Sequence, residues 1–204
     1  MTPLPAIETE RLILRPFREA DLAPFAALNA DAEIMRHFPR PLTAEETEAL
    51  VARIETARAA NGFAFEAVEE KATGAFLGMV GLNAPEFEAP FMPCVELGWR
   101  LVRAAWGRGY ATEAARARLA TAFAPAAEGG LDRDQLVAFA PLGNAPSRAV
   151  MERLGMTRDP EDDFDHPALP LGSPLRRMAL YRIRRARSAS PAPEAGGSRF
   201  GGPR

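Results

Sequence analysis

A short segment with two glycines, "WGRGYATEA" at residues 106–114, opens a run that favours a helix. Glycine lets the backbone turn sharply or approach a ligand closely. The start of a helix also offers unpaired N–H groups and the positive end of the helix dipole, both of which suit a phosphate group. The segment therefore indicates phosphate binding on backbone amides, with a tight turn packed on its own helix as the alternative.

Two common phosphate-binding loops do not match this segment. A Walker loop needs a lysine after its second glycine, and the chain has one lysine, Lys71, far from residues 106–114. A dinucleotide-binding fingerprint needs a third glycine after an initial strand, whereas "GRGYAT" lacks that glycine and follows a late strand. The loop between "VELGWRLV" and a helix has instead the layout that cradles a pyrophosphate.

Other residues could carry acid–base chemistry. Glu96 lies in "VELGW", where strand alternation puts it on one face with Gly98 and Arg100, while Val95, Leu97, Trp99 and Leu101 take the other. A carboxylate on a central strand is costly unless it is paired or hydrated, and an ion pair with Arg100 is the alternative to a catalytic role. The two histidines, His37 and His166, lie in loops, where a solvated side chain is the alternative to a general base.

The elements that position these residues follow from periodicity and capping signals. Strands are expected at 11–17, 63–70, 75–83, 93–102, 134–141 and 175–185. Helices are expected at 18–30, 42–62, 108–124 and 144–155, with a capping box from Thr43 to Glu46 and an N-cap at Asn144. This order predicts an α/β (α+β) fold: a mixed, mostly antiparallel central sheet of about six to seven strands with helices on both faces.

Composition limits the class of protein. The 204 residues suffice for one domain, expected at 1–185, and the Ala/Gly/Ser/Pro-rich residues 186–204 are expected to form a disordered tail. A net charge of −2 argues against a general nucleic-acid binder. A single cysteine, the absence of a secretory signal pattern and the lack of a long apolar run together favour a cytoplasmic protein without a membrane partner.

Four segments in the same order resemble the GCN5-related N-acetyltransferases (GNAT). They are "ETERLILRPFREADL", the strand "VELGWRLV", "WGRGYATEA" and "NAPSRAVMERLGM". Within that superfamily they are similar to the RimJ/RimL-like ribosomal-protein-alanine acetyltransferase branch. The resemblance covers about residues 8–184, and it implies the GNAT fold and an acetyl-CoA-dependent N-acetyltransferase with no metal.

The resemblance also implies a binding site for acetyl-CoA. The family's pyrophosphate loop has the form [Q/R]-x-x-G-x-[G/A]; here Ala104 departs from it at the first place, while Gly107 and Gly109 match. Backbone amides of Trp106, Gly107, Arg108, Gly109, Tyr110, Ala111 and Thr112 would bind the diphosphate, and Arg103 and Arg108 would add charge. Leu101 and Val102 would present backbone to the pantetheine arm, and Asn144 would contact that arm or serve only as a helix cap.

Catalysis is expected by direct attack of a primary amine on the thioester, with no covalent enzyme intermediate. By resemblance, Ser147 would face the sulfur of CoA; a plain first-turn hydroxyl is its alternative role. Glu96 is the candidate base. Glu113, in the first turn of a helix, is expected to be structural.

Acceptor binding is expected from His37 and Phe38, in a proline-framed loop that would close over the amine, and from His166 in the acidic loop "DDFDHPALP". The acidic residues there would suit a cationic amine or form a solvated loop. The acceptor is expected to be a small molecule or a protein N-terminus, and the enzyme a monomer or homodimer. A non-catalytic CoA-binding or sensing protein on the same fold is the alternative, and an interaction module a second one.

Overall fold

The structure is a computed structural model that describes residues 4–186. The strands are β1 (Ile7–Glu8), β2 (Leu12–Arg15), β3 (Phe65–Glu70), β4 (Phe76–Asn83), β5 (Glu96–Leu101), β6 (Gln135–Pro141), β7 (Thr157–Arg158), β8 (Phe164–Asp165) and β9 (Arg177–Arg184). The helices are α1 (Glu19–Ala30), α2 (Ala44–Asn61), α3 (Tyr110–Phe123) and α4 (Ala145–Arg153). Short 3-10 turns are η1 (Ile34–His37), η2 (Arg103–Ala105), η3 (Ala126–Glu128) and η4 (Pro160–Asp162).

The strands form one sheet in the order β1-β2-β3-β4-β5-β6-β9-β7, and β8 also pairs with β9. The neighbours pair antiparallel except for β5 and β6, which are parallel. This confirms the predicted mixed, mostly antiparallel sheet. The three strands beyond the six expected ones, β1, β7 and β8, have two residues each.

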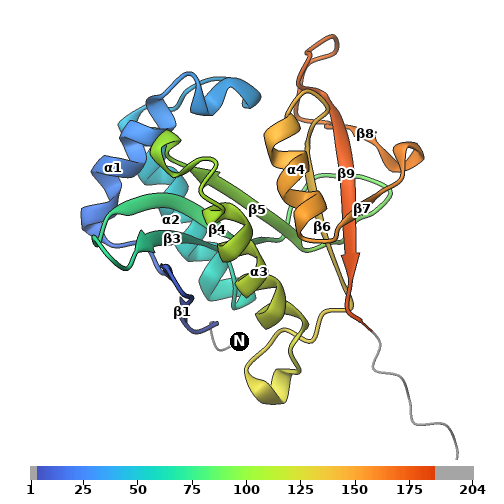
Figure 1. Cartoon of the computed structure of the whole chain (residues 1–204). Coiled ribbons are helices and arrows are strands. Elements are labelled where there is room, and N and C mark those ends of the chain that lie inside the picture. The colour runs from blue at the N-terminus through green and yellow to red at the C-terminus, as the bar shows by residue number, and fades with distance from the viewer. Residues whose placement is uncertain (1–3, 187–204) are drawn as a thin grey trace, which may run out of the picture.

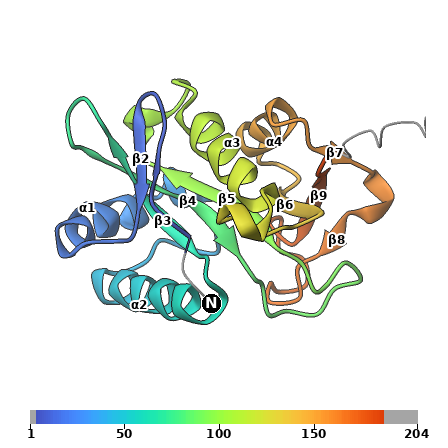
Figure 2. The same ribbon diagram turned by 90° about the horizontal axis from the view of Figure 1, so that it is seen from below.

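Helices cover both faces of the sheet, as predicted. The pair α1 and α2 packs on one face, where Phe25, Leu28 and Ile54 meet Met79 of β4. The pair α3 and α4 covers the other face, where the larger core includes Leu119 of α3. Figure 2 shows the two helix pairs on opposite sides of the strands.

Local sequence signals explain where the helices begin and end. Thr43 and Glu46 form the predicted capping box of α2, and Gly62 ends that helix in the left-handed conformation, with φ of 78°. The Asn144 side chain accepts a hydrogen bond from the Ser147 N–H at the start of α4. Each observed helix lies within a predicted range and is up to three residues shorter.

The sheet opens between β5 and β6. These strands share one paired position, Glu96 with Val137, where the Val137 N–H donates to Val95 O at 3.0 Å. Beyond it β5 stays paired with β4, and β6 stays paired with β9 along its whole length. The two strands therefore diverge toward α4, as Figure 1 shows.

The described strands form one continuous sheet, and the single domain expected at 1–185 stays a prediction. Of the predicted tail at 186–204, all but residue 186 lies outside the described residues.

Candidate active site

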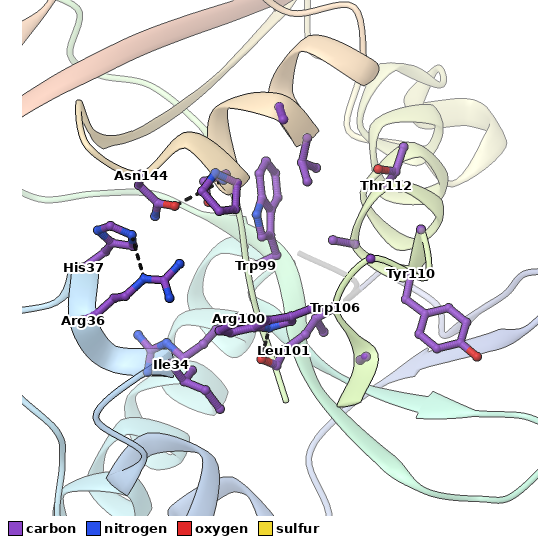
Figure 3. Close-up of a pocket in the computed structure, with 18 of the residues that line it drawn as sticks. Ile34, Arg36, His37, Trp99, Arg100, Leu101, Trp106, Tyr110, Thr112 and Asn144 are labelled. Carbon is purple, nitrogen blue, oxygen red and sulfur yellow. Dashed lines mark hydrogen bonds between the residues drawn. The ribbon is translucent and has the colours of Figure 1, made fainter. Parts of the chain in front are cut away.

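A pocket of about 490 Å³ occupies the opening between β5 and β6 (Figure 3). Its walls come from four parts of the chain: the end of β5, the glycine loop with the start of α3, the first turns of α4, and the η1 segment. Figure 3 shows the Trp99 side chain standing between the α4 side and the α3 side of the cavity. The pocket thus brings together segments that are far apart in sequence.

The β5 backbone offers hydrogen-bonding groups to this opening. In the antiparallel ladder with β4, Val102 donates its N–H to Leu77 O at 2.9 Å, so the even-numbered residues of β5 bond toward β4. The N–H and C=O of Trp99 consequently point to the side where β6 has moved away. Trp99 was not predictable as a site residue, because its position on the apolar face of the strand is typical of a core side chain.

The glycine loop forms a row of unpaired donors beside the pocket. Gly107 and Gly109 have φ of 69° and 81°, a backbone conformation that other residues rarely adopt. Within residues 4–186, no acceptor receives a hydrogen bond from the backbone N–H groups of residues 107–112. Together with the positive end of the α3 dipole, these donors fit the diphosphate of CoA.

The acetyl-CoA contacts predicted on β5 and the glycine loop fall into two groups. Seven of these residues line the cavity: Leu101, Trp106, Gly107, Gly109, Tyr110, Ala111 and Thr112. Val102, Arg103 and Arg108 are not in the lining formed by the described residues. Arg103 pairs with Glu33, and Arg108 lies 3.3 Å from Glu70 and over the Tyr110 ring.

Asn144, the N-cap of α4, and Ser147, in the first turn of that helix, line the pocket. The Ser147 N–H donates to Asn144 Oδ1 at 3.2 Å, so the helix-capping role of Asn144 is present. No acceptor within residues 4–186 receives a hydrogen bond from Asn144 Nδ2 or from the Ser147 hydroxyl. Both groups are therefore available to a ligand in the cavity.

Glu96 lies at the point where β5 and β6 separate, and its carboxylate accepts a hydrogen bond from Asn83 Nδ2 at 3.1 Å. Burial raises the pKa of this carboxyl to about 7, against the opposing effect of the Asn83 hydrogen bond. The side chain is not among the described residues that line the pocket. A carboxyl that titrates near neutrality suits a general base acting directly or through a water molecule.

Arg100 does not neutralise Glu96. Among the ion pairs of residues 4–186 there is none between these two side chains. Arg100 instead lines the pocket, donates from Nη1 to Asn29 Oδ1 at 2.6 Å, and lies over the Phe38 ring at 4.1 Å from its centre. The alternative of a Glu96–Arg100 pair is therefore wrong.

His37 and Phe38 line the pocket at η1, so the loop in which they were predicted to bind the acceptor does border the cavity. His37 Nε2 accepts a hydrogen bond from Arg36 Nε at 3.2 Å, which Figure 3 shows. Burial and the Arg36 charge lower the pKa of His37. The imidazole is therefore neutral near pH 7.

His166 lies apart from this pocket. Its ring packs 4.6 Å from the centre of Phe87, in an aromatic cluster with Phe139 and Phe164. The lining built by the described residues does not include it. Glu113 is held by Thr9 Oγ1 at 2.6 Å and by Arg11, which agrees with the structural role expected for it.

The comparisons with known proteins agree on the family. A family model described as an acetyltransferase (GNAT) domain matches residues 11–157. The chain belongs to the GNAT acetyltransferases. A relative in Bacillus subtilis (strain 168), the uncharacterized protein YkkB, is 31% identical over 149 residues, which cover 72% of this chain and 83% of that protein.

Solved GNAT structures share the fold. An acetyltransferase from Agrobacterium tumefaciens str. C58 is 29% identical, with a TM-score of 0.70 over 91% of this chain and 97% of that one. The ribosomal L7/L12 alpha-N-protein acetyltransferase RimL, in complex with coenzyme A, is 19% identical, with a TM-score of 0.69 over 88% of this chain and 98% of that one. The RimJ/RimL-like resemblance is thus supported at the level of the fold, and this GNAT chain is an acyltransferase.

Residues 4–186 contain neither a candidate membrane span nor a candidate metal centre. No helix in that range is long and apolar enough to span a membrane. No group of three or more His, Cys, Asp or Glu side chains there has the arrangement of a metal site.

Proposed function

We propose that this GNAT enzyme transfers the acetyl group of acetyl-CoA to a primary amine by direct attack in a ternary complex. The observation that carries the proposal is the pocket between β5 and β6. It joins a row of free backbone amides at residues 107–112 to the side chains of Asn144 and Ser147. This arrangement supplies a diphosphate site at one end and hydrogen-bonding groups for a thioester farther in.

Acetyl-CoA would be held mainly by backbone groups. The N–H groups of the glycine loop would bind the diphosphate, and the edge of β5 that faces away from β4 would border the pantetheine arm. Trp99 would offer backbone groups there, whereas the Leu101 C=O already accepts a hydrogen bond from Trp106 Nε1 at 2.9 Å. Asn144 Nδ2 would donate to a carbonyl of that arm while Oδ1 keeps its place as the α4 cap.

Glu96 would remove the proton that the acceptor ammonium must lose before it can attack. Its carboxyl is poised for this task because burial brings its pKa to about 7. Because Glu96 lies outside the described pocket lining, one water molecule would relay the proton from the amine.

The bond changes then balance without a covalent enzyme intermediate. The amine nitrogen bonds to the carbonyl carbon, the C–S bond breaks, and the CoA thiolate leaves with the sulfur electron pair. The Trp99 N–H would polarise the carbonyl oxygen as charge develops on it. The Ser147 hydroxyl would donate a hydrogen bond to the departing sulfur, and the thiolate would take up the second proton, which the nitrogen must lose to become a neutral amide.

The acceptor would be a small amine or a protein N-terminus, bound from the η1 side by His37 and Phe38. One structural neighbour, RimL, is described as acting on the α-amino group of a ribosomal protein. That description supports testing protein N-termini beside small amines for this chain.

The first test is isothermal titration with acetyl-CoA, CoA, ATP and NAD. Micromolar binding of acetyl-CoA and CoA alone is expected, and release of CoA thiol is then measured with a panel of amines. Equal binding of ATP or NAD would contradict the assigned cofactor, and absence of thiol release with every amine would contradict the assigned acceptor class.

A pair of glycine variants makes the binding test specific. Gly107 and Gly172 have φ of 69° and 82°, and a Cβ added to either would meet no atom within 4 Å. Alanine therefore strains both sites alike, by about 1–2 kcal/mol. Gly107→Ala is expected to weaken acetyl-CoA binding about tenfold by disturbing the amide row, whereas Gly172→Ala leaves it unchanged. Equal affinity in both variants would remove the glycine loop from the site.

A further inference from the structure

Arg100, which is half-buried, differs from the three buried arginines of residues 4–186 in having no carboxylate partner. Arg15, Arg58 and Arg118 each lie within 4.0 Å of a carboxylate oxygen. Arg100 has no such partner among residues 4–186, and its Nε is buried without any hydrogen-bond acceptor there. Its side chain lines the pocket. Glu33, the acidic residue in the lining formed by residues 4–186, pairs with Arg36 and Arg103 instead, so Arg100 brings a positive charge without a carboxylate partner to the cavity.

The surroundings of Arg100 hold the guanidinium in place. Asn29 is fully buried on α1 and donates from Nδ2 to Thr47 Oγ1 at 3.2 Å, which directs its Oδ1 toward Arg100 Nη1. The Thr47 hydroxyl in turn donates to Thr43 O at 2.9 Å. The Phe38 ring lies against the guanidinium as a cation–π partner. Figure 3 shows the Arg100 side chain running from β5 toward η1.

This arrangement leaves the charge only partly compensated. Burial lowers the pKa of Arg100 to about 10, because neither an amide oxygen nor an aromatic face replaces the lost hydration of a cation. An anion bound in the pocket would replace the stabilisation that the guanidinium loses when it leaves water. A carboxylate fits best, because the planar guanidinium fork matches its two oxygens.

We propose that Arg100 binds a carboxylate of the acceptor, so that the enzyme prefers amines that also carry a carboxylate group. This inference rests on the proposed acetyl transfer to an amine in the same pocket.

The geometry of β5 limits which acceptors can place a carboxylate at Arg100 while their amine lies near Glu96. Glu96 and Arg100 share one face of the strand, four residues apart, which corresponds to about 13 Å along the backbone. An acceptor with its amine near Glu96 and its carboxylate at Arg100 must therefore separate the two groups by several bonds. A short peptide with an acidic second residue meets this requirement better than a small ω-amino acid, whose amine and carboxylate lie closer together.

Matched acceptor pairs test the inference. The peptide pair is Ala-Glu-Ala-amide and Ala-Gln-Ala-amide, and the small pair is γ-aminobutyrate and γ-aminobutyramide. The wild-type enzyme is expected to favour the carboxylate member of at least one pair by about tenfold in kcat/KM, mainly through KM. Preference in the peptide pair alone would identify a protein N-terminus as the source of the carboxylate, and preference in the small pair alone would identify a small molecule.

Variants assign the preference to this side chain. Arg100→Met is expected to abolish the preference for the carboxylate acceptor and to change the affinity for acetyl-CoA by less than about twofold. Arg100→Lys keeps the positive charge but lacks the planar guanidinium, so it should retain part of that preference. Arg53→Met, at an exposed position on α2, removes the same charge away from the pocket and should behave as wild type. A wild type without preference, or a preference that survives in Arg100→Met, would overturn the inference.

A second readout does not depend on turnover. The dissociation constants of the N-acetylated peptides, Glu against Gln, should show the same dependence on Arg100. If binding depends on Arg100 but no thiol is released, the carboxylate site is supported and the proposed acetyl transfer is contradicted. If the Glu and Gln peptides release thiol at the same rate, the acetyl transfer is supported and the carboxylate site is contradicted. Should Arg100→Met lower the melting temperature, Arg100→Gln, whose amide can still donate to Asn29, serves as the second variant.

Discussion

Two regions of this protein bury charged side chains, and they treat them differently. Beneath α3, Glu66 of β3 forms an ion pair with Arg118, and Arg58 of α2 approaches within 3.8 Å. On β5, Glu96 and Arg100 share one strand face but bond to neutral amides, Asn83 and Asn29. The first region neutralises its charges internally, whereas the second keeps two opposite charges apart beside a cavity.

The difference follows from what each region can bury. Glu66 and Arg118 are each 1% exposed, so neither could remain charged without the other. β5 and β6 part beyond the paired position Glu96–Val137, and Arg100 lines the cavity on that side, where a substrate can reach it. Paired buried charges therefore indicate a structural role, and separated ones beside a pocket indicate substrate chemistry.

Breaking the ion pair beneath α3 is expected to have the largest effect. Arg118→Met leaves Glu66 with a buried charge that only Arg58 can offset, and it should lower the free energy of unfolding by about 3–5 kcal/mol. Urea denaturation measures this loss. Adding Glu66→Met should restore much of the stability, because the uncompensated charge disappears. Activity per folded molecule should persist; a stable but inactive single variant would contradict the structural assignment.

Glu96→Gln is expected to lower kcat about 10²- to 10⁴-fold, because an amide cannot accept the proton of the acceptor amine. Thiol release under saturating acetyl-CoA measures the effect, and acetyl-CoA affinity should remain. Glu48→Gln, at an exposed position on α2, is the matched control. Full activity in Glu96→Gln would move the search for the base to His37, the imidazole that lines the pocket.

The pH dependence should show opposite trends for rate and stability. Because the pKa of Glu96 is about 7, kcat/KM should fall about tenfold per pH unit below that value and level off above it. The folded state holds this proton more tightly than the unfolded chain does, because the ordinary pKa of a glutamate carboxyl is 4.5. The protonated Glu96 carboxyl therefore contributes fully to the stability of the fold below pH 4.5, and this contribution is lost as the pH rises through about 7.

Unfolding of wild type and Glu96→Gln at about pH 5 and about pH 8 checks the second trend. The wild type should lose stability relative to the variant as the pH rises, by on the order of 3 kcal/mol. Parallel stability curves for the two proteins would show that Glu96 is not desolvated in the folded state.

Ser147→Ala is expected to have the smallest effect, a decrease of about threefold to tenfold in kcat, since one neutral hydrogen bond to the leaving sulfur is lost. Single-turnover thiol release measures it. Because Asn144 bonds the Ser147 backbone rather than its hydroxyl, the cap of α4 and the melting temperature should not change. A loss above about a hundredfold would instead assign Ser147 an essential proton-donor role.

Much of the site was predictable because local rules act on adjacent residues. The positive φ at Gly107 and Gly109 and the cap at Asn144 depend on a few consecutive positions, and the structure has them where the sequence places them. The spatial separation of His166 from His37 was not predictable, because loop sequences do not state which end of the sheet they reach.

The sequence by itself determined the elements and their order, the glycine loop ahead of α3, and the family. These are properties of periodicity, capping and short motifs, which operate within one or two turns of chain. Only the tertiary structure decided that β5 parts from β6, that Glu96 bonds to Asn83 rather than to Arg100, and that Arg100 lines the cavity. Those outcomes depend on how β4, β9 and α1 compete for the same backbone and side-chain groups across long separations in sequence.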